Sequence, residues 1–161
     1  GCVATVPSRI FVPGNLAAVG SRTAVAQLSG YPLATPADIV ISYGWQPHTD
    51  RDELVFNSGI AFAVPTPNTA VAVASGTVAF VGGRAGYGLM VVINHAQGLQ
   101  TRYANLSDIA VAVGQTVNTA MPIGSVGKDA PSYLYFEVRT NSASGWVAED
   151  PGKYMPTLEL R

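Results

Sequence analysis

The sequence is poor in charge and in cysteine and has no long apolar run, and each shortage argues against a class of structure or function. Charged residues make up only 12% of the 161 residues and the net charge is −1, so no basic surface predicts nucleic-acid binding. A single cysteine, Cys2, cannot form an internal disulfide. Apolar runs stay shorter than the roughly 20 residues that a membrane-spanning helix requires.

What is abundant points to β-structure. Hydrophobic residues make up 48% of the chain, with valine prominent among them, and 17 glycines and 11 prolines interrupt the apolar runs. Valine favours strands, while glycine and proline favour turns. The length suits one domain with a substantial core. The composition therefore predicts a single, mainly β domain.

Local signals divide the chain into three parts. We expect residues 1–38 to form an N-terminal extension with a short helix over 21–28, where Ser21 is a plausible N-cap and Gly30 follows the last turn. The main domain is predicted at 39–152, and 153–161 form a C-terminal tail. Within the main domain we expect strands at 39–45, 56–64, 89–94, 99–106, 123–126 and 133–139, a strand pair over 71–81 that bends at Ser75-Gly76, and a loop-like segment from Asn141 onward.

Two segments of the domain resemble each other. The run AVAVASGTV at 70–78 is similar to AVAVGQTV at 110–117. Each is predicted to be a hairpin of strand, tight turn and strand, and two copies indicate a duplicated β motif rather than a solenoid.

One strand carries an unusual set of side chains. In residues 133–139, YLYFEVR, apolar residues alternate with two tyrosines, a glutamate and an arginine. A period of two places the polar group on one face of a strand and the apolar group on the other.

This strand closely resembles the signature H-x-H-F-E-V-R of the lysostaphin-type (LytM-like) zinc endopeptidases, which cleave peptidoglycan cross-bridges. Further motifs resemble that family in the same order: SYGW before His48, FNSGIA at 56–61, VASGTV at 73–78, GYG at 86–88 with VVINH at 91–95, TRYANL at 101–106, GQTV at 114–117 and IGSVG at 123–127. The resemblance covers about 39–151 and implies the family's antiparallel, twisted β-sheet sandwich.

The departures from the family pattern fall on its active site. The resemblance places the three zinc ligands at Asn57, Ala61 and Tyr135 and the two catalytic histidines at Asn105 and Tyr133. All five family residues are replaced, whereas the neighbouring glycines and apolar residues match. The resemblance therefore implies a degenerate member, for which we expect no zinc and no catalytic residues.

The chemistry of the substitutes supports this expectation. A catalytic zinc needs three protein ligands and an open position for water. Ala61 has no donor atom, the amide of Asn57 is a poor zinc ligand, and a phenol such as Tyr135 ionises only near pH 10 when unperturbed. Without the metal, no bound water is acidified.

Other reactive residues offer no second catalytic site. His48 lies in a polar loop with Asp50, Asp52 and Glu53, which could bind a cation, although a solvated loop is the simpler interpretation. His95 is interpreted as a structural imidazole. Cys2, one residue from the start, could carry a lipid anchor, but an ordinary thiol is favoured. We assign no chemistry to Glu137 and Arg139, which should pair with neighbouring strands.

The replaced positions could still form a binding groove. If the fold is kept, the floor carries amide and phenol groups, and further aromatic residues border it; the candidate residues are Asn57, Asn105, Tyr133, Tyr135, Tyr43, Trp45 and Tyr87. Aromatic faces with amides suit sugar or peptide recognition. The alternative is that the tyrosines merely fill the volume vacated by imidazole and metal.

The favoured function is a non-catalytic domain of the bacterial cell envelope, periplasmic or extracellular, that binds peptidoglycan or regulates a partner cell-wall hydrolase. This function is implied by the resemblance. One alternative is an active zinc metalloendopeptidase, which would require a different register at all five positions. A second is a lipoyl- or biotin-type carrier, suggested by Gly114-Gln115-Thr116-Val117; neither Lys128 nor Lys153 has the Ala-Met-Lys context of a carrier.

Overall fold

The computed structural model describes residues 28–47 and 53–160. Most of this part is β-structure, and all its strand pairs are antiparallel. The predicted helix at 21–28 lies almost wholly outside the described residues. None of the described helices is long and apolar enough to span a membrane.

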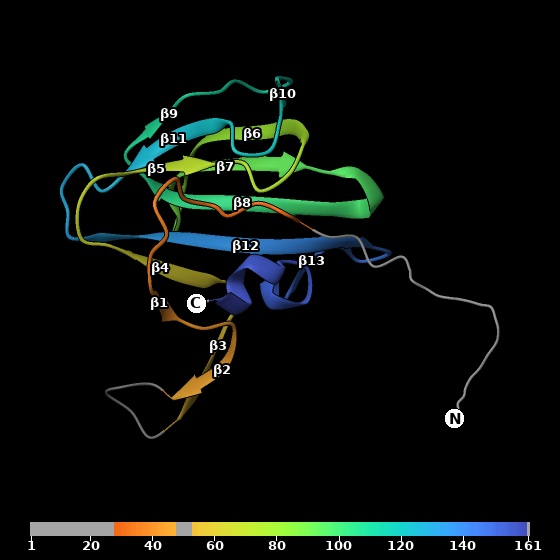
Figure 1. Ribbon diagram of the computed structural model, residues 1–161. Helices are drawn as coiled ribbons and strands as arrows, with labels where there is room; N and C mark the ends of the chain where they lie inside the picture. The colour runs from red at the N-terminus through yellow and green to blue at the C-terminus, as the bar shows by residue number, and fades with distance from the viewer. Residues whose placement is uncertain (1–27, 48–52, 161) are drawn as a thin grey trace.

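The largest sheet has the strand order β1-β4-β12-β8-β7-β6-β10, and β13 also pairs with β12 (Figure 1). Its strands are β1 (Ile39–Ile41), β4 (Ile60–Val64), β6 (Gly76–Arg84), β7 (Gly88–Asn94), β8 (Leu99–Leu106), β10 (Thr116–Val117), β12 (Ser132–Ser142) and β13 (Gly145–Glu149). Three short 3-10 helices are described: η2 (Ala96–Gly98), η3 (Pro151–Lys153) and η4 (Pro156–Leu160).

Two smaller sheets complete the fold. One has the order β5-β11-β9, formed by β5 (Asn68–Val71), β11 (Pro122–Val126) and β9 (Asp108–Ile109). The other is a ribbon of β2 (Gly44–Pro47) and β3 (Leu54–Asn57), which extends away from the main body in Figure 1. The prediction of a mainly β, antiparallel fold is confirmed.

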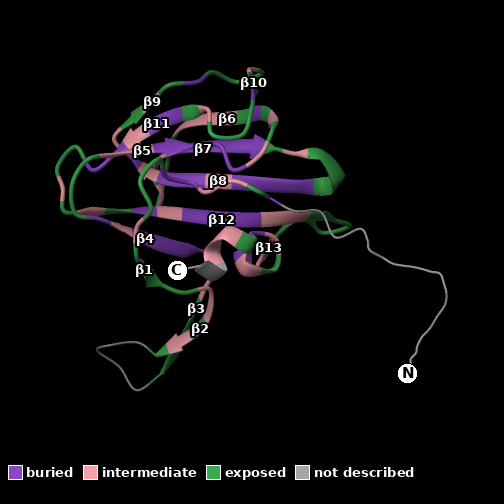
Figure 2. Ribbon diagram, in the orientation of Figure 1, coloured by how far each residue is buried: buried purple, intermediate pink, exposed green. Residues whose placement is uncertain are grey.

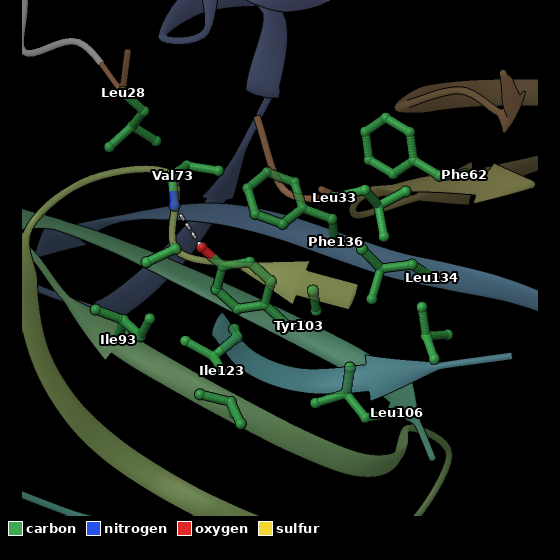
Figure 3. Close-up of a cluster of buried hydrophobic side chains, with 14 of the residues drawn as sticks. Leu28, Leu33, Phe62, Val73, Ile93, Tyr103, Leu106, Ile123, Leu134 and Phe136 are labelled. Carbon is green, nitrogen blue, oxygen red and sulfur yellow. Dashed lines mark hydrogen bonds between the residues drawn. The ribbon is translucent and has the colours of Figure 1, made fainter. Parts of the chain in front are cut away.

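The hydrophobic core contains side chains from both the largest sheet and the three-stranded sheet. Buried residues are concentrated on the central strands of the largest sheet (Figure 2). The Tyr103 ring lies in this core, edge-on to Phe136, and its hydroxyl accepts a hydrogen bond of 3.0 Å from the Val73 amide (Figure 3). Burial raises the pKa of Tyr103 to about 12. Tyr103 is thus a neutral core residue that satisfies a backbone donor.

The segment before β1 contributes to the same core. Leu28 and Leu33 are buried, and Leu33 forms a bridge with Ala70 of β5. The Leu28 amide donates to the Tyr154 carbonyl at 2.8 Å, which joins the two ends of the described chain. The core therefore draws on residues that precede the predicted main domain.

The two similar segments are related in space, but not as two hairpins. The first copy runs from β5 in the three-stranded sheet to β6 in the largest sheet, and the second runs from the end of β9 to β10 in the same two sheets. Equivalent threonines, Thr77 and Thr116, are paired directly where β6 meets β10. The hairpin prediction is wrong because the two strands of each copy belong to different sheets. The duplication itself is visible where β6 of the first copy pairs with β10 of the second.

The segment after Asn141 is also more regular than predicted. β12 continues to Ser142 and turns back into β13, with Gly145 at a positive φ of 101°. The Ser142 hydroxyl donates to the Gly145 carbonyl at 2.8 Å and closes the turn. The small polar residues of this stretch therefore form a hairpin turn rather than a loop.

Candidate functional site

Strand β12 forms the floor of the candidate site. Leu134, Phe136 and Val138 are buried in the core, while Tyr133 and Tyr135 project from the opposite face. Register places Tyr135 beside Ala61 of β4 on one side and Ala104 of β8 on the other. The small neighbouring side chains leave space above the strand. The alternation predicted from the sequence is confirmed for β12.

A cleft of about 360 Å³ lies over this part of the sheet. Its walls come from strands far apart in the sequence and from the glycine-rich loop before β7: Ile41, Ala61, Gly86, Tyr87, Ala104, Asn105, Tyr133 and Tyr135. Four of the seven groove residues predicted from the sequence line it. A second hollow shares Ile41 and is bordered by Ser42, Val55 and Asn57.

Glu137 organises the polar groups beneath the cleft. Its side chain is fully buried, and Tyr135 donates a hydrogen bond of 2.6 Å to its Oε2. Tyr87 donates to the same oxygen at 3.3 Å, and Arg139 Nε donates to Oε1 at 2.7 Å. A buried carboxylate needs such partners because an unpaired buried charge is costly. Three donors therefore hold one carboxylate in place.

This network fixes the protonation state of Tyr135. Burial raises the pKa of the Tyr135 phenol, and the hydrogen bond to the Glu137 carboxylate raises it further. The phenol therefore keeps its proton at neutral pH and donates it in the hydrogen bond to Glu137. The ring lies 5.8 Å from that of Tyr87, so the two phenols form one aromatic wall.

Gly59 allows β12 and the β3–β4 turn to approach closely. A Cβ at this position would collide with the Phe136 carbonyl and lie 2.7 Å from Glu137 Cγ and 3.0 Å from Tyr135 Cζ. The missing side chain therefore lets the turn cover Glu137 and exclude water from it.

Asn105 has a structural role at the edge of the cleft. It adopts a positive φ of 66°, which asparagine tolerates better than most residues. Its Nδ2 donates to the Tyr133 carbonyl at 2.9 Å and to Ser132 Oγ at 3.2 Å. These bonds tie β8 to β12 without involving the Tyr133 ring, which is 44% exposed.

The residues that the resemblance places at the family's zinc positions do not fit the metal. Ala61 offers no ligand atom, and the Tyr135 oxygen is protonated and bonded to Glu137. Asn57 turns its amide nitrogen toward the Ser42 carbonyl at 3.2 Å. Zinc requires imidazole, thiolate or carboxylate ligands, so this donor set cannot hold it. Across 28–47 and 53–160, no three His, Cys, Asp or Glu side chains gather as a possible metal-binding group.

The remaining candidates lie apart from the cleft. Tyr43 and Trp45 pack against Phe56 on the β2–β3 ribbon, with ring centroids 5.4 and 5.3 Å apart. His95 lies between Ser75 O, 2.8 Å from Nδ1, and Thr101 Oγ1, 2.8 Å from Nε2. Burial lowers the pKa of His95, as expected for a neutral structural imidazole. His48 and Cys2 lie outside the described residues.

Glu137 and Arg139 both belong to this site, although no chemistry was predicted for either residue. The alternation in β12 already placed Glu137 on the same face as Tyr133 and Tyr135. Its full burial and its bond to Tyr87, 50 residues away in sequence, depend on tertiary packing. The expectation that it pairs with a neighbouring strand was incomplete, because two of its three donors are on β12 itself.

Relatives among characterised proteins share this domain. The chain is 32% identical over 120 residues to the DD-carboxypeptidase/endopeptidase Mpg of Neisseria meningitidis, covering 73% of this chain and 27% of that protein. It is 38% identical over 71 residues to the murein hydrolase activator EnvC of Escherichia coli, covering 42% of this chain and 17% of EnvC. The matches thus span less than a third of either relative.

Solved structures agree with the fold. Csd3 of Helicobacter pylori superposes with a TM-score of 0.67 and 27% identity over 81% of this chain and 35% of that one. The catalytic domain of lysostaphin from Staphylococcus simulans gives a TM-score of 0.61 over 76% of this chain and 92% of that one; at 24% identity this likeness concerns the fold alone.

Sequence and structure agree on the family of this domain. Residues 55–145 match the sequence profile of peptidase family M23. The matched range includes all five substituted positions and the turn at Gly59, and it confirms the resemblance found in the sequence. The chain belongs to peptidase family M23.

Proposed function

We propose that this chain is a non-catalytic M23 domain that binds peptidoglycan in the bacterial cell envelope, on the periplasmic or extracellular side. The observation that carries this proposal is the hydrogen bond from Tyr135 to Glu137 at a position where the family has a zinc ligand. Tyr135 is the only phenol among the residues at the three zinc positions, and this bond occupies its hydroxyl group.

The loss of catalysis follows from the groups present at the five positions. General-base catalysis near neutral pH favours an imidazole, and Asn105 and Tyr133 do not supply one. Asn105 is also engaged with the β12 backbone. Peptide hydrolysis therefore has neither a metal-activated water nor a base in this cleft.

The retention of a cleft supports binding. Tyr133 exposes its ring at the mouth of a cleft of about 360 Å³, and Tyr87 and Tyr135 form a second aromatic surface. Aromatic faces and phenol groups can stack on sugar rings and hydrogen-bond to peptides. Space-filling alone would not require a ring at the position of Tyr133, because much of it faces solvent.

Incubation with purified sacculi tests the absence of catalysis, and elemental analysis tests the absence of zinc. We expect no new muropeptides by mass spectrometry, with or without added zinc, and no stoichiometric zinc in protein purified without chelator. Cleavage, or about one zinc per chain that is lost on mutating Asn57, would overturn the proposal.

Binding is tested by co-sedimentation with the same sacculi. Tyr133→Ala should weaken binding about two- to tenfold, because an aromatic contact is worth about 0.5–1.5 kcal/mol. Trp45→Ala is the matched control, since Trp45 is an exposed aromatic residue outside the cleft. Failure of the wild type to sediment, or an equal loss in both variants, would argue against cleft binding.

A second candidate is regulation of a partner cell-wall hydrolase. The β2–β3 ribbon exposes apolar side chains, including Trp45 at 64%, Leu54 at 62% and Phe56 at 43%. Such a surface is typical of protein interaction sites, and one relative is named a murein hydrolase activator. Adding the chain to a hydrolase from the same envelope should accelerate sacculus digestion, and Trp45→Ala should reduce the effect. An unchanged rate would exclude this candidate.

A further inference from the structure

A row of side chains crosses the largest sheet next to the cleft. Register pairs Phe80 of β6 with Val92 of β7, Val92 with Arg102 of β8, and Arg102 with Glu137 of β12. Residues paired in this way lie on the same face of a sheet, with strands about 4.8 Å apart. Arg102 is therefore a direct neighbour of the Glu137 network.

Two more guanidinium groups join this row. Arg139 lies two residues beyond Glu137 on the same face of β12 and donates to it at 2.7 Å. The Arg84 guanidinium lies over the Phe80 ring, 4.6 Å from its centroid. Arg102 and Arg139 thus flank a single buried carboxylate, and Arg84 lies farther along the row, over Phe80.

The charges of this cluster do not balance. Glu137 is paired with Arg139, and within the residues that the structure describes no carboxylate lies within 4.0 Å of Arg84 or Arg102. Burial lowers the pKa of Arg102, and the charge of Arg139 lowers it further. An added anion would relieve this repulsion.

The arginines are held in position before any ligand arrives. Arg102 Nε donates to Gln100 Oε1 at 2.8 Å, and Gln100 is itself nearly fully buried and donates to Asn94 Oδ1 at 2.8 Å. Arg139 donates a second bond, to the Trp146 carbonyl, at 3.2 Å. Preorganised guanidinium groups bind carboxylates at lower entropic cost.

The cluster continues the cleft. Tyr87 lines the cleft and donates to Glu137, which lies beside Arg102 in the row. We propose that Arg84, Arg102 and Arg139 bind a carboxylate group of a ligand whose body lies over Tyr87 and Tyr135. This inference rests on the proposed function and makes it specific, because the peptide stems of peptidoglycan carry free carboxylates.

The test uses the full chain with a small carboxylate probe. N-acetyl-D-alanyl-D-alanine and its C-terminal amide are titrated separately into ¹⁵N-labelled protein, and the arginine Nε–Hε resonances are followed by NMR. We expect the acid to shift the Arg102 signal in a saturable manner and the amide to bind about five- to tenfold more weakly.

Three variants separate the site from general charge effects. Arg102→Gln should remove the preference for the acid, and Arg84→Gln should reduce it; Arg84 is exposed, so its replacement keeps the fold. Lys153→Gln removes one exposed positive charge elsewhere and should leave the preference unchanged. Equal binding of acid and amide, or equal effects of Arg84→Gln and Lys153→Gln, would overturn the inference.

The outcomes also distinguish this inference from the proposed function. Wild-type protein that sediments with sacculi but does not prefer the acid would retain the peptidoglycan-binding proposal and exclude the arginine site. Protein that prefers the acid but does not sediment would retain the arginine site and exclude peptidoglycan as the ligand.

Discussion

At the scale of single residues, the phenol of Tyr135 serves the buried carboxylate of Glu137 rather than a metal. Tyr135→Phe removes the 2.6 Å bond and leaves Glu137 less satisfied. We expect the free energy of unfolding to fall by about 1–3 kcal/mol in urea denaturation. Tyr133→Phe, at an exposed ring, should change it by less than about 0.5 kcal/mol. Equal effects would mean that the Glu137 bond adds no stability.

His95 gives the fold a specific pH dependence. Its pKa is lowered in the folded state, so the unfolded chain binds the proton more strongly once the pH falls below about 6.5. Its contribution to stability is complete above that pH and is lost as the pH falls. Unfolding measured between pH 7.5 and 5 should show a shallower decline in His95→Gln, by at most about 1.4 kcal/mol per pH unit. An unchanged slope would contradict this assignment.

At the scale of elements, the β3–β4 turn and β12 depend on the close approach at Gly59. Gly59→Ala should destabilise the protein by about 1–3 kcal/mol, because the new methyl collides with the Phe136 carbonyl and crowds Glu137. Thermal unfolding measures the effect. Gly83→Ala is the control, since a methyl group added there on the outer part of β6 would meet no atom within 4 Å. Similar melting temperatures for Gly59→Ala and the wild type would show that the turn can shift.

At the scale of the whole molecule, the core extends beyond residues 55–145, which match the family. Leu33 is buried and bridges to Ala70, so Leu33→Ala should cost about 2–5 kcal/mol of unfolding free energy. Val113→Ala, at a side chain that is 61% exposed, should cost much less. If Leu33→Ala unfolds like the wild type in urea, the segment before β1 is an extension and not part of the folding unit.

The fold class and the face pattern of β12 could be predicted from the residues in order along the chain. Alternation in 133–139 has a period of two, which depends only on local backbone geometry. The absence of a ligand atom at Ala61 follows from its identity, whatever surrounds it. The duplicated segments were also visible, because a repeat is a property of the sequence.

Which polar side chains lie in contact with one another at the site depends on packing between segments that are distant in the sequence. Tyr87, Arg102 and Glu137 converge through the register of β8 with β12 and the path of the loop before β7, and long-range register leaves no local signal. The same holds for the crossing of each repeat between sheets and for the burial of Leu28 and Leu33. Side-chain identity therefore determines which donor atoms each position can supply, whereas tertiary structure determines which of these groups lie together.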